Sequence, residues 1–244
     1  MNDLTDMVVL VTGGTSGIGK ASAIRFAKAG ARVILAGRND ERGNAVANEI
    51  TLFGGIAEYV KLDLEDESSI EKLVSYISDR YGRLDALFNN AGEYNITPFR
   101  DIKRKKIGEF LDVHLAGTIN LTQKCIDMLL ESQGVILNNA SICGLQDYNK
   151  DPNMVYAMEK AAIIKFTKIL AKKYSIKLRC NALCPGTTKT AIMSEEFYDS
   201  RGHILPRGKV SSPEEVAAVA NFLISRDASC ITGAVIVVDG GESL

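Results

Sequence analysis

The chain alternates short runs of apolar residues with longer segments in which apolar and polar residues recur at helical spacing. The apolar runs predict strands, and they show little of the alternation that is typical of a half-exposed sheet. We therefore expect a sheet that is buried on both faces. The predicted strands are Val8–Val11, Arg32–Ala36, Ala57–Lys61, Ala86–Phe88, Val135–Asn138, Lys177–Leu183 and Ala234–Val238.

The segments between these runs predict amphipathic helices, which is the arrangement that connects parallel strands. The predicted helices include Glu41–Leu52, Ser68–Arg80, Ile102–Leu130, Met154–Tyr174 and Pro213–Ile224. In the first of these helices, Ala45, Ile50 and Leu52 are expected to face inward. No linker or repeat divides the sequence. The pattern thus predicts one α/β domain over residues 1–244, a doubly wound sheet of about seven parallel strands with helices on both faces.

Composition narrows the function classes only slightly. A chain of 244 residues that is 46 % hydrophobic can bury a large core, and a net charge of −1 gives no reason to expect nucleic acid or a membrane as partner. The first residues have no basic segment of the kind that begins a signal peptide. The five cysteines form no C-x-x-C pair and no metal-ligand cluster with the two histidines. We expect reduced thiols, no metal and a cytoplasmic location.

The first predicted strand runs directly into a glycine-rich turn that a helix follows. Glycines allow a tight turn and the close approach of a pyrophosphate, and a helix N-terminus favours an anion. The turn nearly matches the P-loop of Mg²⁺-dependent nucleotide enzymes, but Ala21 stands where a P-loop carries a Ser or Thr hydroxyl. Its glycines at 13, 17 and 19 also depart from the G-x-G-x-x-G spacing. The turn alone therefore predicts a phosphate site without naming its ligand.

Further segments follow this turn in a fixed order: Asn89-Asn90-Ala91-Gly92, the residues around Ser141, Tyr156-Ala157-Met158-Glu159-Lys160, Pro185-Gly186 and Asp239-Gly240-Gly241. With the turn, they resemble the short-chain dehydrogenase/reductase family from about residue 6 to the end of the chain. The resemblance implies a Rossmann fold, an NAD(P) cofactor and hydride transfer that interconverts a ketone and a secondary alcohol. It also implies a homodimer or homotetramer and a small or medium-sized carbonyl or alcohol substrate, with a 3-oxoacyl compound as one subcase.

The resemblance assigns the proton chemistry to Ser141, Tyr156 and Lys160. Tyr156 and Lys160 are four residues apart on a predicted helix and so share one face. An ammonium near a phenol stabilises the phenolate, which suits Tyr156 to act as a general acid or base. Ser141 would donate to the substrate oxygen, and Lys160 would also hold the nicotinamide ribose.

Two positions depart from the family pattern. His114 stands where the family commonly has an Asn that holds a water in a proton path from Lys160. An imidazole could relay protons itself, could disrupt the path, or could simply be hydrogen-bonded within the core. Glu159 replaces the small residue that usually precedes the lysine. It is harmless if it faces solvent, and it perturbs Lys160 if it faces the site.

Cofactor choice depends on the end of the second predicted strand. Members that prefer NAD place an acid at position 37, which would repel a 2′-phosphate, and this chain has Gly37. The adjacent Arg38 suits a 2′-phosphate, although Thr15 and Ser16 supply no second basic residue. We expect NADP(H) to be preferred and NAD(H) to be accepted. The alternative for Arg38 is an ordinary solvated charge.

The resemblance implies further cofactor contacts along the chain. In the turn they are Gly13, Thr15, Ser16, Gly17, Ile18 and Gly19; elsewhere they are Asp63 and Leu64 beside the adenine, Asn90, Ala91, Gly92, Tyr156 and Lys160, and Pro185, Gly186, Thr188 and Thr190 near the nicotinamide. Asp85 and Asn181 are interpreted as structural.

The sequence says little about the substrate. A lid is expected over residues 187–205, with Ile192, Met193, Phe197, Tyr198 and His203 beside Glu195, Glu196 and Arg201, and the loop after Ser141 offers Leu145, Gln146, Tyr148 and Met154. The basic run Lys103–Lys106 is interpreted as a solvated face, with an acidic carrier protein or a phosphorylated substrate as the alternative partner. A non-catalytic dinucleotide-binding regulator is the alternative to an enzyme.

Overall fold

Seven parallel strands form a single sheet in the described part of the chain. The structure is a computed structural model, and it describes residues 3–94, 97–146, 154–191 and 193–244. The sheet has the order β3-β2-β1-β4-β5-β6-β7. Its strands are β1 (Val8–Thr12), β2 (Arg32–Gly37), β3 (Ile56–Lys61), β4 (Ala86–Asn89), β5 (Val135–Asn139), β6 (Arg179–Pro185) and β7 (Val235–Val238). The predicted doubly wound fold is confirmed.

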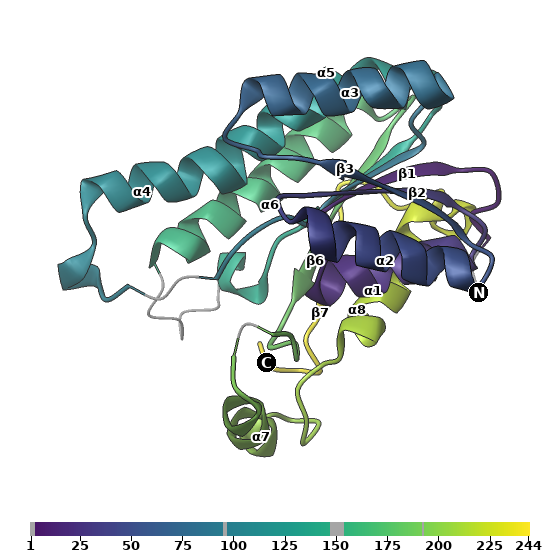
Figure 1. The fold of residues 1–244 in the computed structure, drawn as a ribbon. Coiled ribbons are helices and arrows are strands. Elements are labelled where there is room, and N and C mark those ends of the chain that lie inside the picture. Colours follow the sequence, from purple (N-terminus) through teal and green to yellow (C-terminus); the bar gives the residue numbers. More distant parts are fainter. Residues whose placement is uncertain (1–2, 95–96, 147–153, 192) are drawn as a thin grey trace.

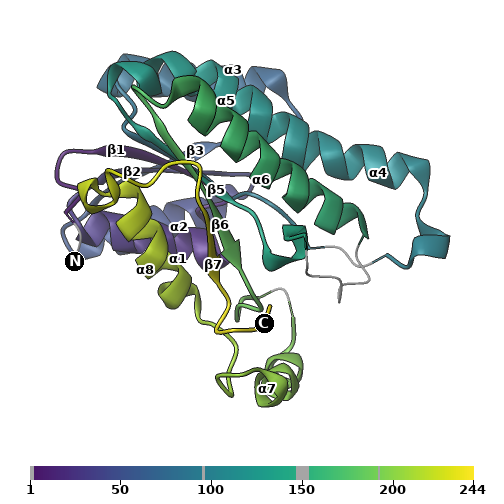
Figure 2. The ribbon, with the colours of Figure 1, turned by 180° about the vertical axis from the view of Figure 1, so that it is seen from behind.

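Helices cover both faces of this sheet (Figure 1). The α-helices of the described residues are α1 (Gly17–Lys28), α2 (Asp40–Leu52), α3 (Glu67–Tyr81), α4 (Arg104–Leu111), α5 (Gly117–Glu131), α6 (Met154–Tyr174), α7 (Glu195–Ile204) and α8 (Pro213–Ile224). Helices α1, α2 and α8 lie on one face and α3, α5 and α6 on the other; the view from behind brings α8 and β7 forward (Figure 2). Among the described residues, none of the helices has the length and apolarity needed to cross a membrane.

Each central strand supplies side chains to two separate cores, one under each layer of helices. In β1, Val9 and Val11 belong to the core on one face, while Val8 and Leu10 belong to the core on the other. All four are buried, which explains why the apolar runs of the sequence do not alternate. Asp85 and Asn181 are structural, as predicted. Asp85 accepts a hydrogen bond from the Val8 amide at 2.8 Å, and Asn181 accepts one from the Ala234 amide at 3.0 Å.

The predicted helix Ile102–Leu130 is helical from Arg104 onward, but it contains a π-helical turn. Helix α4 is followed by a π-helical turn, η2 (Asp112–Ala116), before α5 begins at Gly117. A π turn accommodates one more residue than an α turn, so it changes which side chains face inward. His114, in the middle of η2, is buried.

The predicted inward face of α2 is partly wrong. Ile50 is buried, but Ala45 is exposed and Leu52 is 88 % exposed. The buried residues are Gly43, Val46, Ala47 and Ile50. The reason is a close contact at Gly43, where an added Cβ would lie 2.0 Å from the Tyr59 ring. The Tyr59 hydroxyl donates to the Gly37 carbonyl at 2.7 Å, so this ring fixes the rotation of α2 about its axis.

We predict that Gly43→Ala lowers the free energy of unfolding by about 1–3 kcal/mol, because the added methyl group overlaps a ring that a hydrogen bond holds in place. Gly108→Ala is the matched control, since Gly108 is also helical and an added Cβ there has no neighbour within 4 Å. It should raise the free energy of unfolding by about 0.5–1 kcal/mol. Urea titration of both variants measures the difference, and equal stabilisation would contradict the packing argument.

Candidate active site

The glycine turn after β1 is built to hold an anion. Gly13 and Gly17 have φ angles of +64° and +50°, which favour glycine, and α1 begins at Gly17 within the turn. The N-cap residue Ser16 makes no side-chain capping bond, so the first amides of α1 keep their capacity to donate to a ligand. A Cβ on Gly19 would lie 2.2 Å from the Gly13 carbonyl oxygen. The turn thus has the compact backbone and the open helix N-terminus that a pyrophosphate needs, and its ligand stays a prediction.

Asn90 ties this turn to the centre of the sheet. Its side-chain amide donates to the carbonyls of Thr12 at 3.0 Å and Gly13 at 3.3 Å. The Thr12 hydroxyl in turn accepts from the amides of Asn90 at 2.9 Å and Ala91 at 3.0 Å. Asn139, at the end of β5, donates to the Asn90 side-chain oxygen at 3.0 Å. These bonds join the carboxyl ends of β1, β4 and β5, where a doubly wound sheet binds its ligands.

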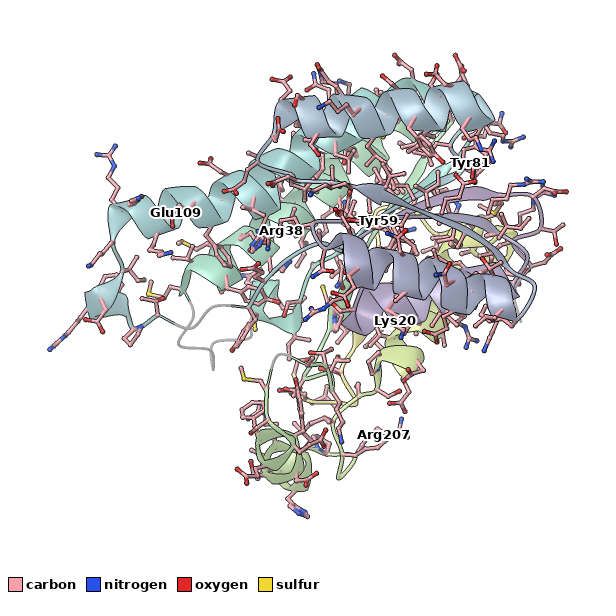
Figure 3. All side chains as sticks on the ribbon, in the orientation of Figure 1. Lys20, Arg38, Tyr59, Tyr81, Glu109 and Arg207 are labelled. Atoms are coloured by element: carbon pink, nitrogen blue, oxygen red, sulfur yellow. The ribbon has the colours of Figure 1, made fainter. Side chains whose placement is uncertain are left out.

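The predicted cofactor residue Arg38 lies just beyond the end of β2, between α2 and α4 in Figure 3. Its guanidinium forms an ion pair with the Glu93 carboxylate, and both side chains are exposed. Gly37 lies against the glycine turn, because a Cβ there would be 3.2 Å from the Thr15 methyl group. The sequence analysis missed Glu93. Its place directly after Gly92 would have put it at the carboxyl end of β4.

The predicted adenine residues follow β3. Asp63 is partly buried, and one of its carboxylate oxygens accepts from the Glu65 amide at 3.1 Å. Leu64 is buried, with its backbone packed so closely on α5 that a Cβ on Gly117 would lie 2.6 Å from the Leu64 carbonyl oxygen. The end of β3 is therefore held firmly against the helix layer.

The side chain of Lys160 extends from α6 to the end of β5. Its ammonium is 5.3 Å from the centre of the Tyr156 ring and donates to the Asn139 carbonyl at 3.3 Å. Tyr94 packs edge-on against the Tyr156 ring at 5.0 Å. A Cβ on Gly92 would be 3.5 Å from the same ammonium, so Lys160 also borders the predicted cofactor segment.

Ser141 lies at the end of β5, where it caps the short helix η3 (Ile142–Gly144) and accepts from the Cys143 amide at 3.2 Å. A hydroxyl that accepts one hydrogen bond still has its own proton to donate. Helix η3 packs on α6 at Lys160, since a Cβ on Gly144 would lie 2.6 Å from the Lys160 carbonyl carbon. Tyr148, in the loop that follows, lies outside the described residues.

Both departures from the family pattern are buried at this site. His114 is 3 % exposed and Glu159 is 0 % exposed. The imidazole Nδ1 lies 3.2 Å from one Glu159 oxygen, and the other Glu159 oxygen lies 3.1 Å from the Lys160 ammonium. Of the two alternatives for Glu159, the structure thus favours the one in which it faces the site.

The predicted lid residues connect the end of β6 with α7. Thr188 donates to the Gly186 carbonyl at 3.0 Å, and the Thr190 methyl group would be 3.1 Å from a Cβ on Gly17. The Thr190 amide donates to the buried Tyr198 hydroxyl at 3.2 Å. Ile192 lies outside the described residues. The lid segment therefore contacts the glycine turn.

The C-terminal segment contacts the start of the predicted lid. Glu242 is buried and accepts from the Thr187 amide at 2.7 Å and from its hydroxyl at 2.9 Å, and it also pairs with Arg201 on α7. A Cβ on Gly186 would lie 2.6 Å from the Asp239 side chain. Hydrogen bonds from Ser243 and Gly241 outweigh the burial of Asp239 and lower the pKa of its carboxyl. The segment that begins at Asp239 thus fixes the start of the predicted lid at Thr187 and contacts α7 at Arg201.

The basic run Lys103–Lys106 at the start of α4 is exposed. Lys105 and Lys106 lie 3.6 Å and 2.9 Å from the two oxygens of Glu109. This arrangement favours a solvated helix face over a preformed anion site.

The site combines a glycine-rich turn at a helix N-terminus, an arginine at the end of β2 and a Tyr–Lys pair at the ligand-binding edge of one doubly wound sheet. This combination is typical of dinucleotide-binding oxidoreductases. The family model described as enoyl-(acyl carrier protein) reductase matches residues 13–243. A 3-oxoacyl-[acyl-carrier-protein] reductase from Aquifex aeolicus is 40 % identical, with 98 % of each chain covered. A 3beta-hydroxysteroid dehydrogenase from Mediterraneibacter gnavus is 31 % identical, covering 99 % of this chain and 96 % of the relative.

The solved structures agree with this assignment. The L-sorbose reductase of Gluconobacter frateurii, complexed with NADPH and L-sorbose, superposes with a TM-score of 0.92 at 27 % identity and covers 100 % of this chain and 99 % of its own. The chain belongs to the short-chain dehydrogenase/reductase family and is an oxidoreductase. The resemblance inferred from its motifs is confirmed.

We predict that Asn90→Ala lowers the free energy of unfolding by about 1–3 kcal/mol, because it leaves partly buried polar groups of the turn and of Asn139 without partners. Asn44→Ala is the control: its side chain also donates to a backbone carbonyl, that of Asp40, at 2.8 Å, but is exposed. The control should change the stability by no more than about 0.5 kcal/mol. Denaturant titration measures both, and a loss as small as that of the control would contradict the proposed tie.

Proposed function

We propose that this protein is an NADP-preferring reductase that interconverts a ketone and a secondary alcohol, with Tyr156 as the general acid or base. The observation that carries the proposal is the position of the Lys160 ammonium, 5.3 Å from the Tyr156 ring and bonded to the strand end at Asn139. This position brings a fixed positive charge to a half-buried phenol at the ligand-binding edge of the sheet.

The residues divide the work as follows. The Ser141 hydroxyl donates to the substrate carbonyl oxygen and orients it. Tyr156 delivers the proton to that oxygen in reduction and removes it in oxidation, because the nearby ammonium stabilises the phenolate. Lys160 also has donors for a ribose hydroxyl. Together these groups stabilise the negative charge that develops on the substrate oxygen.

A nicotinamide dinucleotide fits the residues at the glycine turn and at the strand ends. The crowded positions of Gly13 and Gly19 leave a backbone cradle for the pyrophosphate, and Asp63 and Leu64 stand where the adenine is expected. Gly37 places no acidic side chain that would repel a 2′-phosphate. Arg38 can bind this phosphate when its ion pair with Glu93 breaks. When bound, the cofactor supplies or accepts the hydride. The NADPH in the sorbose reductase structure supports the preference for the phosphorylated form.

The substrate is proposed only as a class. The relatives carry names that refer to 3-oxoacyl, steroid and sugar substrates at comparable identity, so similarity does not choose among them. A 3-oxoacyl compound remains the named subcase, supported by the 40 % identity to the Aquifex aeolicus reductase. The same proposal includes a lid over residues 187–205. It also includes a homodimeric or homotetrameric assembly and a cytoplasmic location.

We predict that Tyr156→Phe lowers turnover about 10²- to 10⁴-fold, while the Kd for NADPH changes less than about twofold. The measurement is a panel of ketones and secondary alcohols assayed in both directions with NADP(H) and NAD(H). A non-catalytic dinucleotide-binding regulator would show no turnover that depends on Tyr156. A wild-type protein that turns over no compound of the panel above the Tyr156→Phe background would overturn the proposal.

We predict that Arg38→Gln weakens NADPH binding about 10- to 100-fold and leaves NADH binding nearly unchanged, because a charge-assisted bond to the 2′-phosphate is lost. Glu93→Gln should strengthen NADPH binding up to about fivefold, since it removes a competing surface ion pair. Arg32→Gln, at the opposite end of β2, is the control and should leave both affinities unchanged. Fluorescence titration tests this, and equal losses for both cofactors with Arg38→Gln would contradict the assignment.

A further inference from the structure

A chain of buried polar groups runs from the end of β4 to the Lys160 ammonium. The backbone amide of Glu93 donates to Nε2 of His114 at 3.1 Å. His114 Nδ1 lies 3.2 Å from Glu159 Oε2, and Glu159 Oε1 lies 3.1 Å from Lys160 Nζ. The side chains of His114 and Glu159 are shielded from solvent, and that of Lys160 is 7 % exposed. These groups come from three elements: the segment after β4, the π-helical turn η2 and α6.

The backbone amide determines which imidazole nitrogen carries the proton. A backbone N–H can only donate, so Nε2 of His114 must accept and cannot carry a hydrogen. The proton of the neutral ring is therefore on Nδ1, where it donates to the Glu159 carboxylate. The ring also packs edge-on against Phe110 at 4.3 Å, which limits its rotation.

The contact between Glu159 and Lys160 is an ion pair rather than a well-directed hydrogen bond. The two atoms are 3.1 Å apart, yet Glu159 Oε1 accepts no hydrogen bond of good geometry from the described residues. The carboxylate thus acts on Lys160 through its charge, while the ammonium donates to the Asn139 carbonyl.

We propose that Glu159 and His114 act as one positioning unit for Lys160: His114 holds the carboxylate, and the carboxylate holds the ammonium and offsets its charge beside Tyr156. This proposal rests on the proposed function of Tyr156 and Lys160. It chooses between the roles that the sequence left open for His114. A relay needs both ring nitrogens to exchange protons, and the Glu93 amide occupies Nε2. His114 therefore orients Glu159 and does not conduct protons.

Two further titratable groups lie close to this unit. Tyr94 packs against the Tyr156 ring, and the Cys184 thiol on β6 is near enough to Lys160 for the ammonium to act on it. Burial raises the pKa of the Cys184 thiol to about 12, so this thiol stays neutral at ordinary pH. The Glu93 carboxylate is directed outward to Arg38. Neither of the two titratable groups adds a charge beside Tyr156 that offsets the Lys160 ammonium as the Glu159 carboxylate does.

The first test is the pH dependence of alcohol oxidation. Glu159→Gln keeps the size of the side chain but removes a negative charge beside Lys160, which favours the phenolate of Tyr156. The acidic limb of kcat/KM should therefore move to lower pH by about one unit. Met158→Gln is the control, because Met158 is the preceding residue of α6 and is 54 % exposed, and its limb should stay in place. A limb that is unmoved in Glu159→Gln overturns the proposal.

The second test asks whether His114 acts through Glu159. His114→Leu should lower kcat about tenfold in the wild-type background, because Glu159 loses the group that orients it. In the Glu159→Gln background the same substitution should have little further effect on kcat, and the limb should stay where Glu159→Gln put it. Effects that multiply in the double variant would show independent roles and would overturn the positioning unit.

A third test uses NMR of the wild-type protein, so it requires neither an activity assay nor a folded variant. The ¹⁵N shifts of the imidazoles in the ligand-free protein report which nitrogen is protonated, and the chain has two histidines, of which His203 is exposed. We expect a Nδ1–H tautomer for His114; a Nε2–H tautomer would overturn the proposal.

The outcomes also distinguish the two proposals. If no compound of the panel shows turnover that depends on Tyr156, the proposed function is wrong. Turnover that depends on Tyr156 but not on Glu159 defeats the positioning unit alone.

Discussion

The site depends on the hydrogen bonds by which Asn90 joins the carboxyl ends of three parallel strands. Its side chain reaches the Thr12 and Gly13 carbonyls beside β1 and accepts from Asn139 at the end of β5. The Asn139 carbonyl then accepts from Lys160. One frame therefore positions both the phosphate-binding turn and the ammonium beside Tyr156. Such a frame matters because small displacements of reacting groups are costly in rate.

A second set of buried polar contacts fixes the helices that carry the chemistry. The Asn89 side chain donates to Thr122 on α5 at 3.0 Å and to Asn138 on β5 at 2.8 Å, and Asn138 donates to Thr167 on α6 at 2.9 Å. Thr167 is seven residues after Lys160 and lies on the same face of α6. Polar contacts of this kind specify a single rotation of the helix, which apolar packing alone does not do. That rotation turns Lys160 and Glu159 toward the sheet.

The strands could be predicted from the sequence because their residues are buried on both sides of the sheet. Helices α6 and α8 could be predicted because each has an apolar face along its full length, and both have the predicted bounds. Helix α7 was not predicted because it buries only Tyr198 and Gly202, too few residues for a periodic pattern. The π-helical turn has no signal in apolar spacing, so the direction of His114 could not be read from the sequence.

The same limit explains which parts of the site escaped prediction. Motifs identified Tyr156 and Lys160 because their relation is local, four residues on one helix. The pairs Arg38–Glu93 and Glu93–His114 join residues 55 and 21 positions apart, so they depend on how the strands and helices pack.

The two departures from the family pattern are best understood as one feature. Without His114, the Oε2 atom of the Glu159 carboxylate would be buried with no hydrogen-bond donor beside it. Burying a charged group without such a partner is strongly unfavourable. An imidazole at 114 with a small residue at 159 would leave its Nδ1–H without an acceptor. Each residue thus removes the cost that the other would carry alone. Both penalties would arise beside Lys160, because Glu159 contacts its ammonium. The pair that stabilises the fold here is therefore also the pair that holds Lys160 in position.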